Sequence, residues 1–402
     1  MKSWDLLKND IMRDLWFARV FTAIGDEFTS FAIVIILAST LSNNSGLVLS
    51  IQSYAIIASG ILLAPLAYKT NRQRLLSTLD LLRVVFVLIP VVAISISTSY
   101  LLPSVLFCII SVYILRPVFE PTIQAVIPSV VSSSSEILVA NGLFDSVRRL
   151  ARIIGPALAG LLILIVNPSD LFVFSAIGYI FSAVLILRKK WPKDAVYAKD
   201  SFQSKKNAMN GFRQLAQDST MCFHVTAHAL QSGAWYLGFI IALSLLPKYN
   251  HNFTYHDFGV ALSVYGIGNL LSNFIVSEKI NTMKLWILSL GRIVSSVGFL
   301  MIFESDTPYM LYLSCAIAAV GAPITEIPLV TLMQTRFSSS AISDVYRSTM
   351  ILEALATIII LTISPLIISN FGVRGAILVT CFVYLSVSIF GFVFFTKENK
   401  ND

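Results

Sequence analysis

The sequence predicts an all-α polytopic membrane protein with twelve transmembrane helices in two six-helix halves, and three observations support this. The 402 residues are 56% apolar and only 13% charged, with a mean hydropathy of +0.78, whereas soluble domains usually carry about 25% charged residues. Twelve apolar segments follow one another, and each has roughly the 20 residues that a bilayer crossing needs. The cationic residues gather on one side of such a topology. This composition excludes an ordinary soluble enzyme.

The apolar segments form two groups of six. The first group lies near residues 16–41, 47–67, 76–97, 101–127, 141–166 and 171–188, and the second near 220–247, 257–277, 284–303, 309–335, 345–369 and 373–396. The stretch between the groups is the longest polar run in the interior, so it is interpreted as a linker. We therefore expect an N-terminal half at residues 1–190, a cytoplasmic linker at 191–219 and a C-terminal half at 220–402.

The distribution of positive charge orients the chain. With both termini inside, the loops place only Lys248 and Arg374 of the 29 Lys and Arg residues on the outer side, as the positive-inside rule requires. The N-terminus shows no signal-peptide pattern, so both termini are expected in the cytoplasm of a bacterial cell, with the chain in its inner membrane. The net charge of +7 then reflects orientation, and no nucleic-acid partner is expected.

Polar side chains recur at helical spacing in four of the expected crossings, the first, fourth, seventh and tenth. The stripes are Arg19, Thr22, Asp26 and Thr29 with Glu27 beside them; Tyr113, Arg116, Glu120 and Gln124; His224, His228, Gln231 and Trp235; and Glu326 with Gln334. Ionisable residues at bilayer depth usually face a protein interior or a wet cavity, so the stripes predict a substrate cavity. The alternative is structural, since charges four residues apart can simply neutralise one another.

Asp26 and Glu27 are the most unusual pair, because two adjacent carboxylates in an apolar helix cannot both be ionised at low cost. One of them can therefore take up a proton on one side of the membrane and release it on the other. The alternative is that Gly25 and Asp26 lie at a helix packing contact, or that Asp26 pairs with an arginine from a neighbouring helix. A metal site at His224 and His228 is not expected, because no third ligand is evident, and no cofactor is expected either.

Two motifs resemble those of the major facilitator superfamily. The fifth crossing carries Gly142, Ala151, Gly155-Pro156 and Ala159-Gly160, which is similar to the antiporter signature of helix five with two glycines replaced by alanine. The loop between the second and third crossings resembles the superfamily's gating motif, because it keeps the basic positions Lys69, Arg72 and Arg74, although Tyr68 stands at the acidic position. The chain most resembles the twelve-helix proton-coupled efflux branch, which includes macrolide-efflux permeases and siderophore exporters.

The resemblance implies the major facilitator fold, with helices one, four, seven and ten lining a central cavity. It gives Arg116 the position of the helix-four arginine associated with proton coupling in antiporters. Proton-coupling candidates are then Asp26, Glu27, Arg116, Glu120 and Glu326. Candidates for gating or conformational change are Lys69, Arg72, Arg74, Gly142, Gly155, Pro156 and Gly160.

The leading hypothesis is a secondary transporter that exports a small amphipathic molecule or drug in exchange for protons by alternating access of the two halves. The alternative is a dedicated exporter of a siderophore or another endogenous metabolite, and lysophospholipid transport is less favoured. An embedded enzyme or receptor is disfavoured, because no nucleophile motif, metal cluster or nucleotide loop is present. The expected partners are a small-molecule substrate, protons and the lipid bilayer, and the expected state is a monomer.

Overall fold

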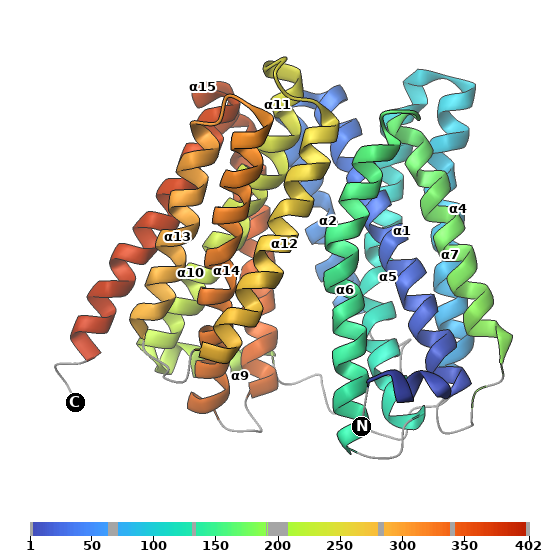
Figure 1. Cartoon of the computed structure of the whole chain (residues 1–402), viewed down its shortest axis with the longest axis horizontal. Coiled ribbons are helices and arrows are strands. Elements are labelled where there is room, and N and C mark those ends of the chain that lie inside the picture. The colour runs from blue at the N-terminus through green and yellow to red at the C-terminus, as the bar shows by residue number, and fades with distance from the viewer. Residues whose placement is uncertain are drawn as a thin grey trace. The chain divides into compact units, whose positions relative to one another are not determined.

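The computed structural model describes residues 3–62, 71–130, 134–189, 191, 208–279, 285–337 and 342–398, and these are helical almost throughout (Figure 1). Within the described ranges no β-strand occurs, which fits a bilayer, where a helix satisfies its own backbone hydrogen bonds. Lys69 and Tyr68 of the expected gating motif lie outside the described residues. The same holds for the side chains of Glu120, Gln124 and Gln334.

The expected first half contains six long helices. They are α1 (Asp10–Leu41), α2 (Ser45–Leu62), α4 (Arg72–Ile96), α5 (Leu101–Val130), α6 (Ser134–Leu162) and α7 (Leu171–Arg188). The start of α4 is fixed by Asn71, whose side chain accepts a hydrogen bond from the Arg74 backbone N–H at 3.0 Å, an N-cap that satisfies one of the free donors of a helix start.

The expected second half begins with the short helix α9 (Ala208–Gln217). The long helices that follow are α10 (Ser219–Trp235), a π-helical turn (Tyr236–Ala242) continued by α11 (Leu243–Tyr249), α12 (Tyr255–Lys279), α13 (Leu285–Phe303), α14 (Pro308–Arg336) and α15 (Ile342–Glu398). The last of these contains two crossings, because Gly372 interrupts it with a φ of 73°, a conformation that glycine adopts without strain.

The helices confirm the all-α membrane fold. Nine stretches of the described chain are long and apolar enough to cross a membrane, and two of them, Asp10–Ser59 and Ser348–Phe392, span 50 and 45 residues. Because a crossing needs about 20 residues, each of these two holds two crossings. The helix α6 has 29 residues and is long enough for a further crossing, so the arrangement is consistent with the twelve that the sequence predicts.

The chain divides into two compact units. The first consists of Met1–Thr40 and Ile51–Phe202, and the second of Leu41–Ser50 and Gln203–Asp402. The turn that connects α1 to α2 thus belongs to the second unit, where the Tyr249 hydroxyl donates a hydrogen bond to Asn43 Oδ1 at 2.9 Å. Lys248 also contacts Ser42 there.

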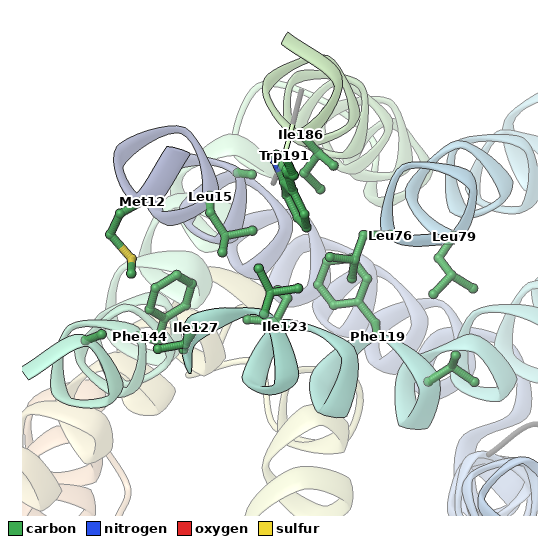
Figure 2. Packing of buried hydrophobic residues seen from close by; sticks show 14 of the residues in the cluster. Met12, Leu15, Leu76, Leu79, Phe119, Ile123, Ile127, Phe144, Ile186 and Trp191 are labelled. Atoms are coloured by element: carbon green, nitrogen blue, oxygen red, sulfur yellow. The ribbon is translucent and has the colours of Figure 1, made fainter. Parts of the chain in front are cut away.

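Each unit has its own apolar core. In the first unit, side chains from α1, α4, α5, α6 and α7 interdigitate, and Trp191, which follows α7, packs beside Leu15 and Ile186 (Figure 2). In the second unit the corresponding cluster includes Met221, Leu288 and Met333. Large apolar side chains such as Val85 and Val92 are more than half exposed, as expected of a surface that faces lipid.

Candidate functional site

A buried group of charges lies in the first unit between α1, α4 and α7. On α4, Arg83 and Asp80 are one turn apart, their side chains are 1% and 0% exposed, and Arg83 Nη1 lies 3.4 Å from Asp80 Oδ1. The same nitrogen lies 3.9 Å from Oδ1 of Asp26 on α1. The ring of Phe119 on α5 covers the guanidinium, with its centroid 4.5 Å away. Arg83 is therefore held by two carboxylates and an aromatic face, both of which favour a cation.

Hydroxyl groups complete this group of charges. Ser182 Oγ donates a hydrogen bond to Asp80 Oδ2 at 2.6 Å, and the Tyr179 hydroxyl donates one to Asp26 Oδ1 at 2.9 Å. Both donors belong to α7. We call Asp26, Asp80, Arg83, Tyr179 and Ser182 the first charge centre.

Two glycines allow α1 and α7 to come close enough for this contact. A Cβ atom at Gly178 would lie 2.8 Å from the carbonyl oxygen of Phe21, and one at Gly25 would lie 3.2 Å from the Tyr179 ring. Small residues at a crossing let helix backbones approach in membranes. The packing contact at Gly25 thus places the Tyr179 hydroxyl beside Asp26.

Glu27 lies beside a different helix from Asp26. A Cβ atom at Gly155 of α6 would overlap the Glu27 side chain, so the glycine of the helix-five motif is what makes room for Glu27. Asp26 lies at ion-pair distance from Arg83, while the arginines whose charges act on Glu27 are Arg152 and Arg116.

The second unit contains a buried arginine of its own. Arg292 on α13 is 0% exposed, and its Nε donates a hydrogen bond to Gln231 Oε1 at 3.1 Å. Its Nη1 lies 3.1 Å from His224 Nδ1. Arginine has no acceptor, so the Nδ1 of His224 carries the lone pair and the imidazole is neutral. Within the described part of the chain, no carboxylate lies at ion-pair distance from Arg292.

The other histidine of the α10 stripe meets an acid. His228 Nε2 lies 3.5 Å from Glu353 Oε1 on α15, and the two side chains are 18% and 34% exposed. Further along the same helix, Trp235 stacks on Phe239 with ring centroids 5.4 Å apart. The stripe therefore divides between a buried arginine and a partly exposed carboxylate.

The structure brings several of the sequence-predicted residues together. Thr22 and Thr29 flank the first charge centre: Thr22 donates to Asp80 Oδ2 at 3.5 Å, and the Thr29 hydroxyl lies 3.4 Å from that of Tyr179. Tyr113 meets Ser30 at 3.2 Å, and its ring centroid lies 6.0 Å from the guanidinium of Arg116. The remaining described candidates are placed as follows: Arg19 and Arg72 are buried, Arg74 and Glu326 are exposed, and Gly142, Gly155, Pro156 and Gly160 lie in α6.

The partner of Asp26 is Arg83, an arginine of a neighbouring helix. Sequence reasoning missed Asp80, Tyr179 and Ser182, which lie on the third and sixth crossings, where no long polar stripe occurs. The sequence signal that could have found them is the pair Asp80 and Arg83. An acid three residues before an arginine is rare in an apolar helix, so the pair indicates a buried polar site.

Comparisons with known proteins identify the family. The profile described as Major Facilitator Superfamily matches residues 15–359. The chain belongs to the Major Facilitator Superfamily. A search of curated protein sequences finds no match.

Solved structures of other transporters share this major facilitator fold. A mutant form of the nucleoside transporter NupG superposes with a TM-score of 0.76 at 12% identity, covering 95% of this chain and 99% of its own. A POT family transporter in complex with a thioalcohol-conjugated peptide gives 0.75 at 14% identity, covering 96% of each chain. A bacterial homologue of the human lysosomal transporter Spinster, in an inward-facing and unoccupied conformation, gives 0.73 at 13% identity, covering 95% and 96%. At these identities the likeness establishes the fold.

Proposed function

We propose that this major facilitator protein is a secondary active transporter that exports a small amphipathic molecule by proton antiport with alternating access. The observation that carries the proposal is Asp26, a carboxylate at bilayer depth that is 16% exposed and held by Arg83. Ionisable groups in that position are expensive and mark proton or substrate pathways. The proposed setting is the inner membrane of a bacterium, with a monomer whose termini are both cytoplasmic.

The first charge centre suggests how a proton could be coupled to movement. A proton on Asp26 cancels its charge, which weakens its attraction to Arg83 and its hydrogen bond from Tyr179. Asp80, which is fully buried on the same helix as Arg83, still compensates the guanidinium. Protonation therefore loosens α1 from α4 and α7 without leaving a buried charge unpaired.

The accessible charges favour a cationic substrate. Glu326 is exposed and Glu353 is 34% exposed, whereas Arg19, Arg83 and Arg292 are at most 5% exposed and Arg116 is partly exposed. Acids that solvent can reach attract cations, and buried arginines offer an anion no contact. Amphipathic cations are therefore the first class to test, and anionic chelators such as siderophores are the second.

The test is transport by purified protein in liposomes, with ethidium as the cationic probe. An imposed pH gradient should drive ethidium accumulation by the wild type. In Asp26→Asn, accumulation should fall to the level without a gradient while ethidium exchange remains, because binding and alternation do not require the proton. Glu120→Gln is the second variant to compare.

Asp10→Asn is the matched control, since it makes the same chemical change at the cytoplasmic start of α1, where Asp10 contacts Arg13 at 2.9 Å and also pairs with Lys189. It should retain the full gradient response. Wild-type protein that moves ethidium at a rate independent of the pH gradient would refute proton antiport. A normal gradient response in both Asp26→Asn and Glu120→Gln would move the coupling role to other acids.

A further inference from the structure

The third helix of each expected half carries the same short sequence pattern around its buried arginine. Residues 79–85 of α4 read LDLLRVV, and residues 288–294 of α13 read LSLGRIV. Arg83 and Arg292 are thus equivalent, and both are at most 1% exposed. The last helix of each half also contacts the equivalent position: Ser182 donates to the Asp80 carboxylate, and Ser388 donates to the Ser289 carbonyl oxygen at 2.8 Å.

The two positions differ in their acids. Where α4 has Asp80, α13 has Ser289, and where α1 offers the Asp26 carboxylate, α10 offers the neutral amide of Gln231. The second unit therefore buries the permanent positive charge of Arg292, but it lacks counterparts of the two carboxylates that balance Arg83 in the first unit. An uncompensated buried charge is strongly unfavourable, so an acid elsewhere in this unit is expected to balance it.

The histidines of α10 lead from Arg292 to such an acid. His224 accepts from Arg292 at 3.1 Å, His228 lies one turn further along the helix, and His228 faces Glu353 at 3.5 Å. His228 and Glu353 are both partly exposed, and ionisable groups at bilayer depth face a wet cavity more often than lipid, so we expect protons to reach them, whereas His224 is fully buried.

Other charged and titratable groups act on this pair or on its charged neighbours. They include Arg292 of α13, which acts on both histidines; Glu326 of α14, which acts on Glu353; Arg336 of α14, which acts on His224; Tyr346 of α15, which senses both acids; Tyr384 of α15, which senses Glu326 and Arg292; and Tyr265 of α12, which senses Glu326. Arg292 and Glu326 carry opposite charges, so Arg292 favours the pair without its proton and Glu326 favours the pair with it.

We propose that His228 and Glu353 form a second proton-binding site, in which one proton is shared between the imidazole and the carboxylate. With the proton bound, the pair is neutral overall. When the proton leaves, the pair carries one negative charge, which balances Arg292. This site is separate from the first charge centre, and only its role in coupling rests on the proposed function.

Histidine NMR tests the site without any substrate. The chain has four histidines, His224, His228, His251 and His256, so each nitrogen-15 signal can be assigned by single substitution in detergent-solubilised protein. The His228 signal should titrate, and in Glu353→Gln its midpoint should move to lower pH by about one unit or more, because a carboxylate at contact distance is removed. His224 should stay neutral with its proton on Nε2.

Glu304→Gln, at the exposed outer end of α13, is the matched control and should leave the His228 titration unchanged. Glu353→Asp keeps the charge at a shorter reach and should give an intermediate shift, which keeps the test valid if Glu353→Gln fails to fold. An unchanged His228 midpoint in a folded Glu353→Gln or Glu353→Asp protein would overturn the proposal.

Ethidium transport then separates the site from the function. If the pair takes part in coupling, Glu353→Gln should lose gradient-driven accumulation and keep exchange, as expected of Asp26→Asn. If the wild type moves no ethidium, the proposed function fails for this class of substrate, while the NMR titration still decides whether the pair binds a proton.

Discussion

Arg83 is the side chain on which the first charge centre depends, because it is the cation that faces both Asp26 and Asp80. Replacing it by leucine leaves Asp80, which is fully buried, and Asp26, which is 16% exposed, without their cation. We expect Arg83→Leu to lower the free energy of unfolding by about 3–5 kcal/mol, as for other broken buried ion pairs. Thermal unfolding can be followed with a thiol-reactive dye, since Cys108, Cys315 and Cys381 are buried.

A double variant provides the control for this prediction. Asp80→Asn combined with Arg83→Leu removes one of the two orphaned charges, so it should unfold at a higher temperature than Arg83→Leu alone. If Arg83→Leu melts like the wild type, the charges around Asp26 are balanced by other groups and the first charge centre is not a unit.

Helical spacing predicts which polar residues share a face, but it does not predict the partner of each. Thr22, Asp26 and Thr29 do lie together beside one group of charges, as the first stripe suggests. The choice of Arg83 as the partner of Asp26 depends on which helices touch, and that contact is set by Gly25 and Gly178. Single glycines in an apolar helix are too common to reveal a crossing by themselves.

At the scale of helices, the contact between α1 and α6 is tight at Gly155, whose hydrogen lies against the Glu27 side chain. We expect Gly155→Leu to abolish ethidium transport, because a larger side chain must push α6 away from α1; such overpacking costs about 1–3 kcal/mol. Pro156→Leu should have a similar effect, since it restores a backbone donor in a helix that is interrupted there. Flux and the amount of folded protein in the membrane are measured together.

Ile154→Leu is the control for the α6 variants, because Ile154 is 44% exposed on the same helix and its change is nearly isosteric. It should transport normally. Wild-type flux through well-folded Gly155→Leu protein would contradict a role for this helix contact in the transport cycle.

Helix existence was predictable from hydropathy, whereas the form of some helices was not. The π-helical turn at Tyr236–Ala242 falls inside a uniformly apolar stretch, where no residue breaks the pattern. The break at Gly372 is the opposite case, because the sequence places a polar, glycine-containing segment between two apolar runs. A break that coincides with polar and glycine residues can be predicted from the sequence. A change of hydrogen-bond register inside an apolar run cannot.

At the scale of the whole molecule, we predict that the expected halves, residues 1–190 and 220–402, move relative to one another during transport. Spin labels at Ser99 and His251 report on the ends assigned to the outside, and labels at Arg74 and Gln217 report on the ends assigned to the cytoplasm; all four positions are exposed. With ethidium and a pH gradient, one pair should separate as the other approaches.

The same labels on protein in liposomes without substrate or gradient are the reference. Distances that stay fixed at both ends under transport conditions would rule out alternating access by movement of the halves. The fold itself was predictable at this scale because bilayer thickness dictates segment length. The assignment of Leu41–Ser50 to the second unit was not, since contiguous sequence suggests a contiguous unit.

The π-helical turn affects how the two portions of the seventh crossing can rotate relative to each other. A π turn holds one residue more than an α turn, so the segment behaves as a one-residue insertion that rotates everything beyond it by about 100°. The portion before the turn is held by Arg292 through His224 and Gln231, and the portion after it by Tyr249 through Asn43. Deleting one residue from 236–242 would rotate the two portions of the crossing relative to each other. Only one of the two sets of hydrogen bonds could then form. Migration of the extra residue along the helix would let one portion turn while the other stays in place.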